Sequence, residues 1–194
     1  MKYIYFSLMI FLWGCQRIPK EGDDFFKQGA YEEAIVAYSD YLSGHEPTTA
    51  VLYNRGRSFE EIGKYKNALM DFQKILELDK KNIRAQTSIA KVKYESGDFE
   101  QSVLAAQKAI AWSPDFAQSH FWLAKGAHQM GYFDDALKSY GKAIKLNPDY
   151  GDAFYYRGAL KISMEKVDSA CEDFSNANRL NVEGSSSAKK KYCS

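Results

Sequence analysis

The sequence is poor in the residues that interrupt or cross-link a chain, since its 194 residues include four prolines and three cysteines. So few cysteines exclude a scaffold built from disulfides, and so few prolines suit packed helices better than sheets broken by turns. An excess of one charge is also lacking, because 26 basic residues face 25 acidic ones. This balance gives no positive field for a polyanion, so we expect no nucleic-acid partner. The hydrophobic fraction of 45% is too high for a disordered chain and predicts a substantial folded domain.

Motifs for catalysis and for metal binding are lacking as well. The three histidines, His45, His120 and His128, have no metal-ligand spacing, and the sequence contains no Cys-x-x-Cys pair. It also contains no phosphate-binding glycine loop and no nucleophile elbow. We therefore expect no enzyme activity, no cofactor and no metal site.

An apolar stretch over residues 3–13 follows the single charge of Lys2. It is shorter than the roughly 20 residues that a membrane-spanning helix needs. A basic residue, a short apolar segment and then a small residue form the plan of a secretory signal peptide, which we place at residues 1–14.

The end of this stretch, residues 12–15 (Leu-Trp-Gly-Cys), resembles the lipobox of bacterial lipoproteins, although Trp13 departs from the usual pattern. The resemblance implies lipidation of Cys15 after cleavage and a lipid-anchored linker over residues 15–19. The alternatives are an ordinary signal peptide with an incidental cysteine, or an uncleaved anchor.

The rest of the chain is periodic, with a period of 34 residues. An alanine column, a turn-glycine column, a large-ring column and a small-residue column all keep this register. They are Ala34, Ala68, Ser102, Ala136, Ala170; Gly29, Gly63, Gly97, Gly131; Tyr38, Phe72, Ala106, Tyr140, Phe174; and Gly56, Ala90, Ala124, Gly158. Two antiparallel helices per block account for these columns, because small residues let two backbones approach and glycine ends the first helix.

A 34-residue period with glycine, aromatic, alanine and proline in this order closely resembles the tetratricopeptide repeat family; in the fourth block these are Gly131, Phe133, Ala136 and Pro148. The resemblance implies an all-α fold, a right-handed solenoid of five antiparallel helix pairs over residues 20–184 with a short C-terminal capping helix. The expected repeats are residues 15–48, 49–82, 83–116, 117–150 and 151–184, and the cap is residues 185–194. Pro19 truncates the first helix, which we expect to begin near Lys20, and Glu165 replaces the last turn glycine.

In this family the first helix of each pair usually lines the concave face, where peptides or partner helices bind. The resemblance therefore selects two columns of residues on the first helices. One column contains aromatic or hydroxyl residues, and the other, four residues later and so one helical turn away, contains mostly cations. With three neighbouring residues, the predicted groove consists of Tyr53, Arg57, Arg84, Lys91, Tyr94, Phe121, Lys125, His128 and Tyr155.

Cations beside aromatic rings suit an acidic peptide segment or a C-terminal carboxylate. The alternative is a solvated helix face, whose lysines contribute little to stability. Glu60 and Glu95 lie near enough in sequence to neutralise part of the strip. An asparagine-bearing carboxylate clamp, known in some family members, has only Asn54 as a near candidate.

Two cysteines remain besides Cys15. Cys171 stands in a column of Ile35, Leu69, Val103 and Leu137, so we expect it to be buried, and a docked capping helix would bring Cys193 towards it. An oxidising compartment, and a resemblance to bacterial repeat lipoproteins that end on a cysteine, favour a disulfide. The alternative is two free thiols.

Together these features predict a non-enzymatic interaction scaffold of the bacterial cell envelope that binds a peptide or partner segment in its groove. Gln16, rather than aspartate, follows the cysteine, and by resemblance to lipoprotein sorting signals we expect an outer-membrane location facing the periplasm. The alternative function is a structural subunit of an envelope assembly, held through its convex or end faces. Salt-sensitive binding of an acidic peptide would separate the first function from the second.

Overall fold

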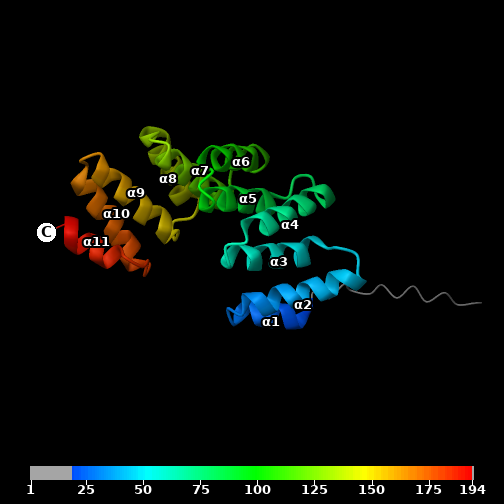
Figure 1. Cartoon of the computed structure of the whole chain (residues 1–194). Helices are drawn as coiled ribbons and strands as arrows, with labels where there is room; N and C mark the ends of the chain where they lie inside the picture. The colour runs from blue at the N-terminus through cyan, green and yellow to red at the C-terminus, as the bar shows by residue number, and fades with distance from the viewer. Residues whose placement is uncertain (1–18, 194) are drawn as a thin grey trace, which may run out of the picture.

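The computed structural model describes residues 19–193, which form eleven helices and no strand (Figure 1). The predicted all-α class is therefore confirmed. Residues 1–14, Cys15 and the linker up to residue 18 lie outside the described residues. Within residues 19–193 each helix is too short or too polar to span a bilayer.

The helices follow one another along a curved path. They are α1 (Lys20–Lys27), α2 (Tyr31–Gly44), α3 (Thr49–Glu61), α4 (Tyr65–Leu78), α5 (Ile83–Glu95), α6 (Phe99–Trp112), α7 (Ala117–Gln129), α8 (Phe133–Leu146), α9 (Gly151–Ser163), α10 (Val167–Arg179) and α11 (Ser185–Tyr192). Each odd-numbered helix from α1 to α9 packs on the helix that follows it, and α11 packs on α10. Five pairs stack into a solenoid that ends with a short capping helix (Figure 1). The first helix begins at Lys20, with Pro19 at the N-cap. Proline is tolerated there because the backbone N–H that it lacks would have no partner within the helix.

The core includes a row of four small clusters that runs from the first repeat to α9. All five members of the alanine column are 0% exposed. The serine among them, Ser102, satisfies its hydroxyl by donating to the carbonyl of Ala90 at 2.8 Å. The four rings of the large-ring column are at most 1% exposed, so four of the five repeats centre on one buried ring.

Helix pairs approach closely because a small residue faces that ring. A Cβ added at Gly56 would lie 2.8 Å from the ring of Phe72, and one added at Gly22 would lie 2.6 Å from that of Tyr38. In the third repeat the ring is replaced by alanine, and there the small position holds Ala90. In the fourth repeat Ala124 stands at the small position opposite Tyr140, so a residue no larger than alanine is common to all these positions.

The turns inside the repeats need a left-handed residue. The four turn glycines, Gly29, Gly63, Gly97 and Gly131, have φ between 72° and 82°. Glu165 adopts the same conformation at φ 59° without the freedom of glycine, so the last repeat carries backbone strain at its turn.

Two repeats contain a bidentate ion pair that the sequence analysis did not identify. Arg55 donates two hydrogen bonds to the carboxylate of Asp71, from Nε at 2.9 Å and from a terminal guanidinium nitrogen at 2.7 Å. Three repeats later, Arg157 binds Asp173 in the same way. Both carboxylates are nearly buried. Each pair joins the two helices of its repeat through charge-assisted hydrogen bonds of fixed geometry.

The C-terminal cap is tied to the last repeat by a disulfide between Cys171 and Cys193, whose Cα atoms lie 5.6 Å apart. The ring of Tyr192 also stacks on Phe174, with 6.3 Å between centroids. Cys171 is half-buried, so the expectation of full burial was wrong. Its whole column is half-buried, since it lies at the edge of each junction rather than under the central ring.

Gly56→Ala should destabilise the protein by about 1–3 kcal/mol, because the new methyl group meets the ring of Phe72 in a packed core. Gly141 is the matched control, since an added Cβ there meets nothing nearer than 3.7 Å inside α8. Gly141→Ala should stabilise the protein by up to about 1 kcal/mol through helix propensity. Urea unfolding midpoints measure both changes. Equal midpoints for the two variants would contradict the packing argument.

Candidate partner-binding groove

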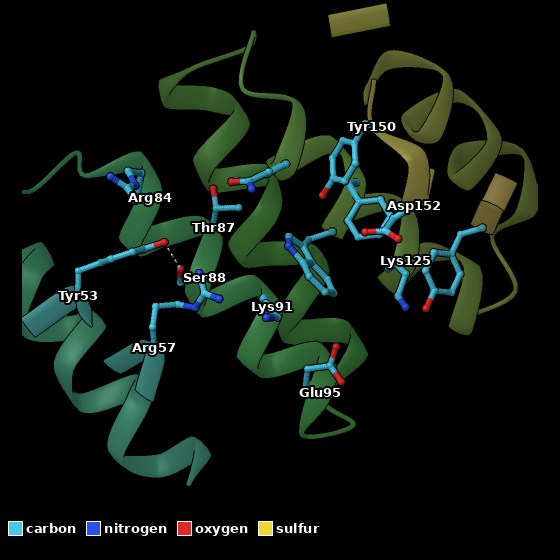
Figure 2. Close-up of a pocket in the computed structure, with 14 residues that line it drawn as sticks. Tyr53, Arg57, Arg84, Thr87, Ser88, Lys91, Glu95, Lys125, Tyr150 and Asp152 are labelled. Carbon is cyan, nitrogen blue, oxygen red and sulfur yellow. Dashed lines mark hydrogen bonds between the residues drawn. The ribbon is translucent and has the colours of Figure 1, made fainter. Parts of the chain in front are cut away.

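A cavity of about 390 Å³ opens on the face formed by the first helices of the second to fifth repeats, α3, α5, α7 and α9 (Figure 2). Its walls are mostly aromatic and charged. The lining residues are Tyr53, Arg57, Arg84, Thr87, Ser88, Lys91, Glu95, Gln118, Phe121, Trp122, Lys125, Tyr150, Asp152 and Tyr156.

Six of the nine predicted groove residues line this cavity: Tyr53, Arg57, Arg84, Lys91, Phe121 and Lys125. Tyr94 lies directly behind the wall, with its ring centroid 4.5 Å from the ammonium of Lys125. The structure therefore brings seven of the nine residues together from three helices.

The other two predicted groove residues, His128 and Tyr155, are corrections, because neither lines the cavity. His128 packs edge-on against Phe133 and Tyr140 within the fourth repeat. The ring of Tyr155 lies 5.9 Å from that of Phe174, in the last repeat. The next residue, Tyr156, takes the wall position instead.

Lys125 is the most unusual group of the cavity, because it is 7% exposed and lies in an aromatic box. Its ammonium lies 3.6 Å from the ring centroid of Tyr156 and 5.9 Å from that of Trp122, in addition to Tyr94. Among residues 19–193 no carboxylate pairs with it and no acceptor binds it. Ring faces attract a cation but leave its hydrogen-bond donors unused, so Lys125 retains the capacity to bind an anion.

Arg57 and Lys91 differ from Lys125, because both form ion pairs with the carboxylate of Glu60. Glu60 is 5% exposed and forms ion pairs with Nζ of Lys91 and, at 3.6 Å, with Nε of Arg57. Arg57 also binds Glu61 at 3.0 Å. Burial raises the pKa of Glu60, while Lys91 and Arg57 act in the opposite direction.

The three cations of the predicted column, Arg57, Lys91 and Lys125, therefore differ in their surroundings. Arg57 and Lys91 are half-buried partners of a buried acid, and removing them would leave that acid uncompensated at a large cost in stability. Lys125 alone among the three is free of carboxylates within the described chain.

The two ends of the cavity differ in charge. At one end the guanidinium of Arg84 lies 4.6 Å from the ring centroid of Tyr53, whose hydroxyl is 3.4 Å from that of Ser88. Burial alone would raise the pKa of Tyr53, but the Ser88 hydrogen bond and the charge of Arg57 lower it. At the other end burial, together with Asp152 and Glu95, raises the pKa of Tyr156. Four basic and two acidic side chains line the cavity. Glu60 compensates Arg57 and Lys91, so within the described residues Arg84 and Lys125 are the cations of the wall without a carboxylate partner.

Several groove residues escaped the sequence analysis. Trp122 and Tyr156 each follow an aromatic residue that had been considered, so the paired rings at residues 121–122 and 155–156 were the available signal. Glu60 was noted as a neighbour, but its burial was not foreseen. Within residues 19–193 no group of His, Cys, Asp and Glu side chains could hold a metal ion.

Stacked helix pairs, with a cavity lined by their first helices, define a helical repeat protein. A tetratricopeptide repeat model matches residues 20–83 and a TPR repeat model matches residues 127–164. The two segments together cover more than half of the chain, which belongs to the tetratricopeptide repeat family. Members of this family are typically non-enzymatic modules of protein–protein interaction.

Solved structures share the whole fold at low sequence identity. The crystal structure of MamA superposes with a TM-score of 0.68 at 24% identity, over 88% of this chain and 97% of that chain. The thermophilic TPR protein TTC0263 of Thermus thermophilus gives a TM-score of 0.72 at 18% identity, over 85% and 90% of the two chains.

Curated relatives match only a part of the chain. Sperm-associated antigen 1 of Rattus norvegicus is 30% identical over 70 residues, or 36% of this chain and 8% of that protein. The mitochondrial import receptor subunit TOM70 of Homo sapiens is 31% identical over 81 residues, or 39% of this chain and 13% of that protein. The chain thus spans only 8% and 13% of the length of these relatives.

The charge of Lys125 should be measurable at His128. Burial and, secondarily, the positive charge of Lys125 lower the pKa of His128. Lys125→Met removes that charge, so the pKa of His128 should rise while burial still holds it below its ordinary value. An NMR pH titration of the His128 ring measures the shift, with Lys145→Met as a control on the same protein. A pKa of His128 that falls, or stays fixed, in Lys125→Met would contradict this arrangement of charges.

Proposed function

We propose that this protein is a non-enzymatic scaffold of the bacterial cell envelope that binds an acidic peptide segment or a C-terminal carboxylate of a partner protein in the cavity between α3 and α9. The observation that carries the proposal is Lys125, a largely buried residue whose ammonium is held by ring faces and lines the cavity. A partner carboxylate supplies the hydrogen-bond acceptors that the rings cannot supply.

The surroundings of Lys125 suit a short anionic group on an apolar stem. Trp122 provides apolar contact area, and Gln118 offers a neutral hydrogen-bonding group. Glu95 and Asp152 repel a second acidic group at the same end, so the site selects for one well-placed carboxylate rather than for a long acidic run. Arg84 at the far end is the next available cation.

Membership of the family supports a role in protein binding, since its repeats serve as interaction modules. One relative is named as an import receptor subunit, although this chain covers only 13% of it. We extend the proposal to an exported protein anchored through lipidated Cys15, on the resemblance of residues 12–15 to a lipobox. A short linker to α1 would then hold the solenoid close to the membrane, which we place at the outer membrane facing the periplasm.

Lys125→Met should reduce partner recovery in crosslinking and pulldown from intact envelopes, because methionine fills the aromatic box without a charge. A charged hydrogen bond contributes about 1.5–3 kcal/mol, so the affinity should fall about 10- to 100-fold. Lys145→Met, an exposed lysine at the end of α8, is the matched control and should recover partner as the native chain does. Undiminished recovery with Lys125→Met would overturn the groove proposal.

The anchor has a separate test. Cys15→Ser should release the protein from the membrane fraction or leave residues 1–14 uncleaved, because the lipid is attached at that thiol. Intact mass and membrane fractionation of both forms measure this. A native chain recovered without lipid would reject the anchor and leave the groove proposal untouched.

A further inference from the structure

A second hollow, of about 410 Å³, lies between α1 and α2 in the first repeat, outside the groove. Its floor is apolar and consists of Phe25, Val36 and Ala37, with Val36 59% exposed. Its rim carries four carboxylates, and they are Glu21, Glu32, Glu33 and Asp40. Within residues 19–193 none of these four side chains forms an ion pair or accepts a hydrogen bond. The first repeat therefore presents an apolar floor inside an uncompensated negative rim.

Interior repeats show what surrounds the equivalent positions. In the fourth repeat Leu123 and Ala127 take the positions of Glu21 and Phe25, and α6 of the preceding repeat adds Val103 and Gln107 as a third wall. In the second repeat the Arg55–Asp71 pair spans the place and Arg55 also donates to Ser39 of α2 at 3.2 Å. The described chain gives the first repeat no such neighbouring helix, so its hollow lacks the third wall that the equivalent hollow of the fourth repeat has.

The opposite end of the solenoid has the complementary charge. Helix α11 carries Lys189, Lys190 and Lys191, all exposed, and Tyr192 beside them is 38% exposed. Lys189 shares a hollow with Asp168 and Glu172 next to the disulfide. Lys190 and Lys191 have no carboxylate partner within residues 19–193. They are therefore the cations available for an outside contact.

The two ends lie apart in the molecule, since α1 and α11 occupy separate ends of the curved stack (Figure 1). We propose that α11 of one copy docks into the α1–α2 hollow of a second copy. The lysine stems and the edge of Tyr192 cover the apolar floor, and the ammonium groups reach the rim carboxylates. The disulfide holds α11 in its docked position before binding, which lowers the entropy lost on association.

Such a contact joins two different surfaces, so it is head-to-tail and can continue from copy to copy. One short helix in one hollow makes a small interface, and the pairs at its rim are exposed. The association should therefore be weak and should be reduced by salt.

Photocrosslinking in the full chain, expressed in its own membranes, tests the contact. A photoreactive amino acid replaces Val36, and two epitope tags distinguish the copies. The expected product is a crosslink between position 36 of one copy and residues 189–192 of a differently tagged copy. Glu32→Lys with Glu33→Lys, or separately Lys190→Glu with Lys191→Glu, should each reduce the product about tenfold. Mixing the two charge-reversed chains should restore it, because the reversed surfaces are again complementary.

Controls separate this contact from other occupants of the hollow. Lys125→Met should leave the crosslink unchanged, so failure of the groove proposal and failure of this one are distinguishable. A crosslink only to another protein, or only to residues 1–18 of the same copy, would overturn the proposal. So would a crosslink between copies that both charge reversals leave intact. The yield and helicity of each variant identify any chain that fails to fold. The two charge reversals lie on different helices, so either one suffices.

Discussion

The close approach of two helices around one buried ring is the constraint on which the whole solenoid depends. Each ring of the second helix reaches the backbone of the first only where that helix carries glycine or alanine, as Gly56 does for Phe72. The alanine column then fills the remaining space at 0% exposure. Because every repeat meets the same requirement at the same spacing, successive repeats stack in one register, and their first helices come to share a face.

On that shared face, cations at equivalent positions of three repeats have different neighbours. Arg57 and Lys91 meet buried Glu60, so their charges contribute to holding α3 against α5. Lys125 meets only rings, one repeat further on, and its charge remains available to a ligand. The same helical position thus has a carboxylate partner in two repeats and only aromatic neighbours in the third, since the neighbouring side chains differ.

The ends of the stack differ from its interior for a related reason. An interior repeat is covered on both sides, whereas the described first repeat lacks a preceding helix and the last is followed only by α11. The sequence places acidic residues on the first hollow and lysines on the last helix. Charge keeps these apolar end surfaces hydrated and, if they meet in two copies, makes the contact directional and sensitive to salt.

The sequence by itself determined the repeat length, the helix pairs, the core columns and the cysteines available for pairing. These follow from local periodicity and from steric rules that each repeat obeys alone. Only the tertiary structure decided that Glu60 is buried, that Tyr156 rather than Tyr155 faces the cavity, and that Lys125 sits among rings. Each of these depends on how one repeat is rotated against the next, and that rotation results from packing at the junctions, which a column of residues does not record.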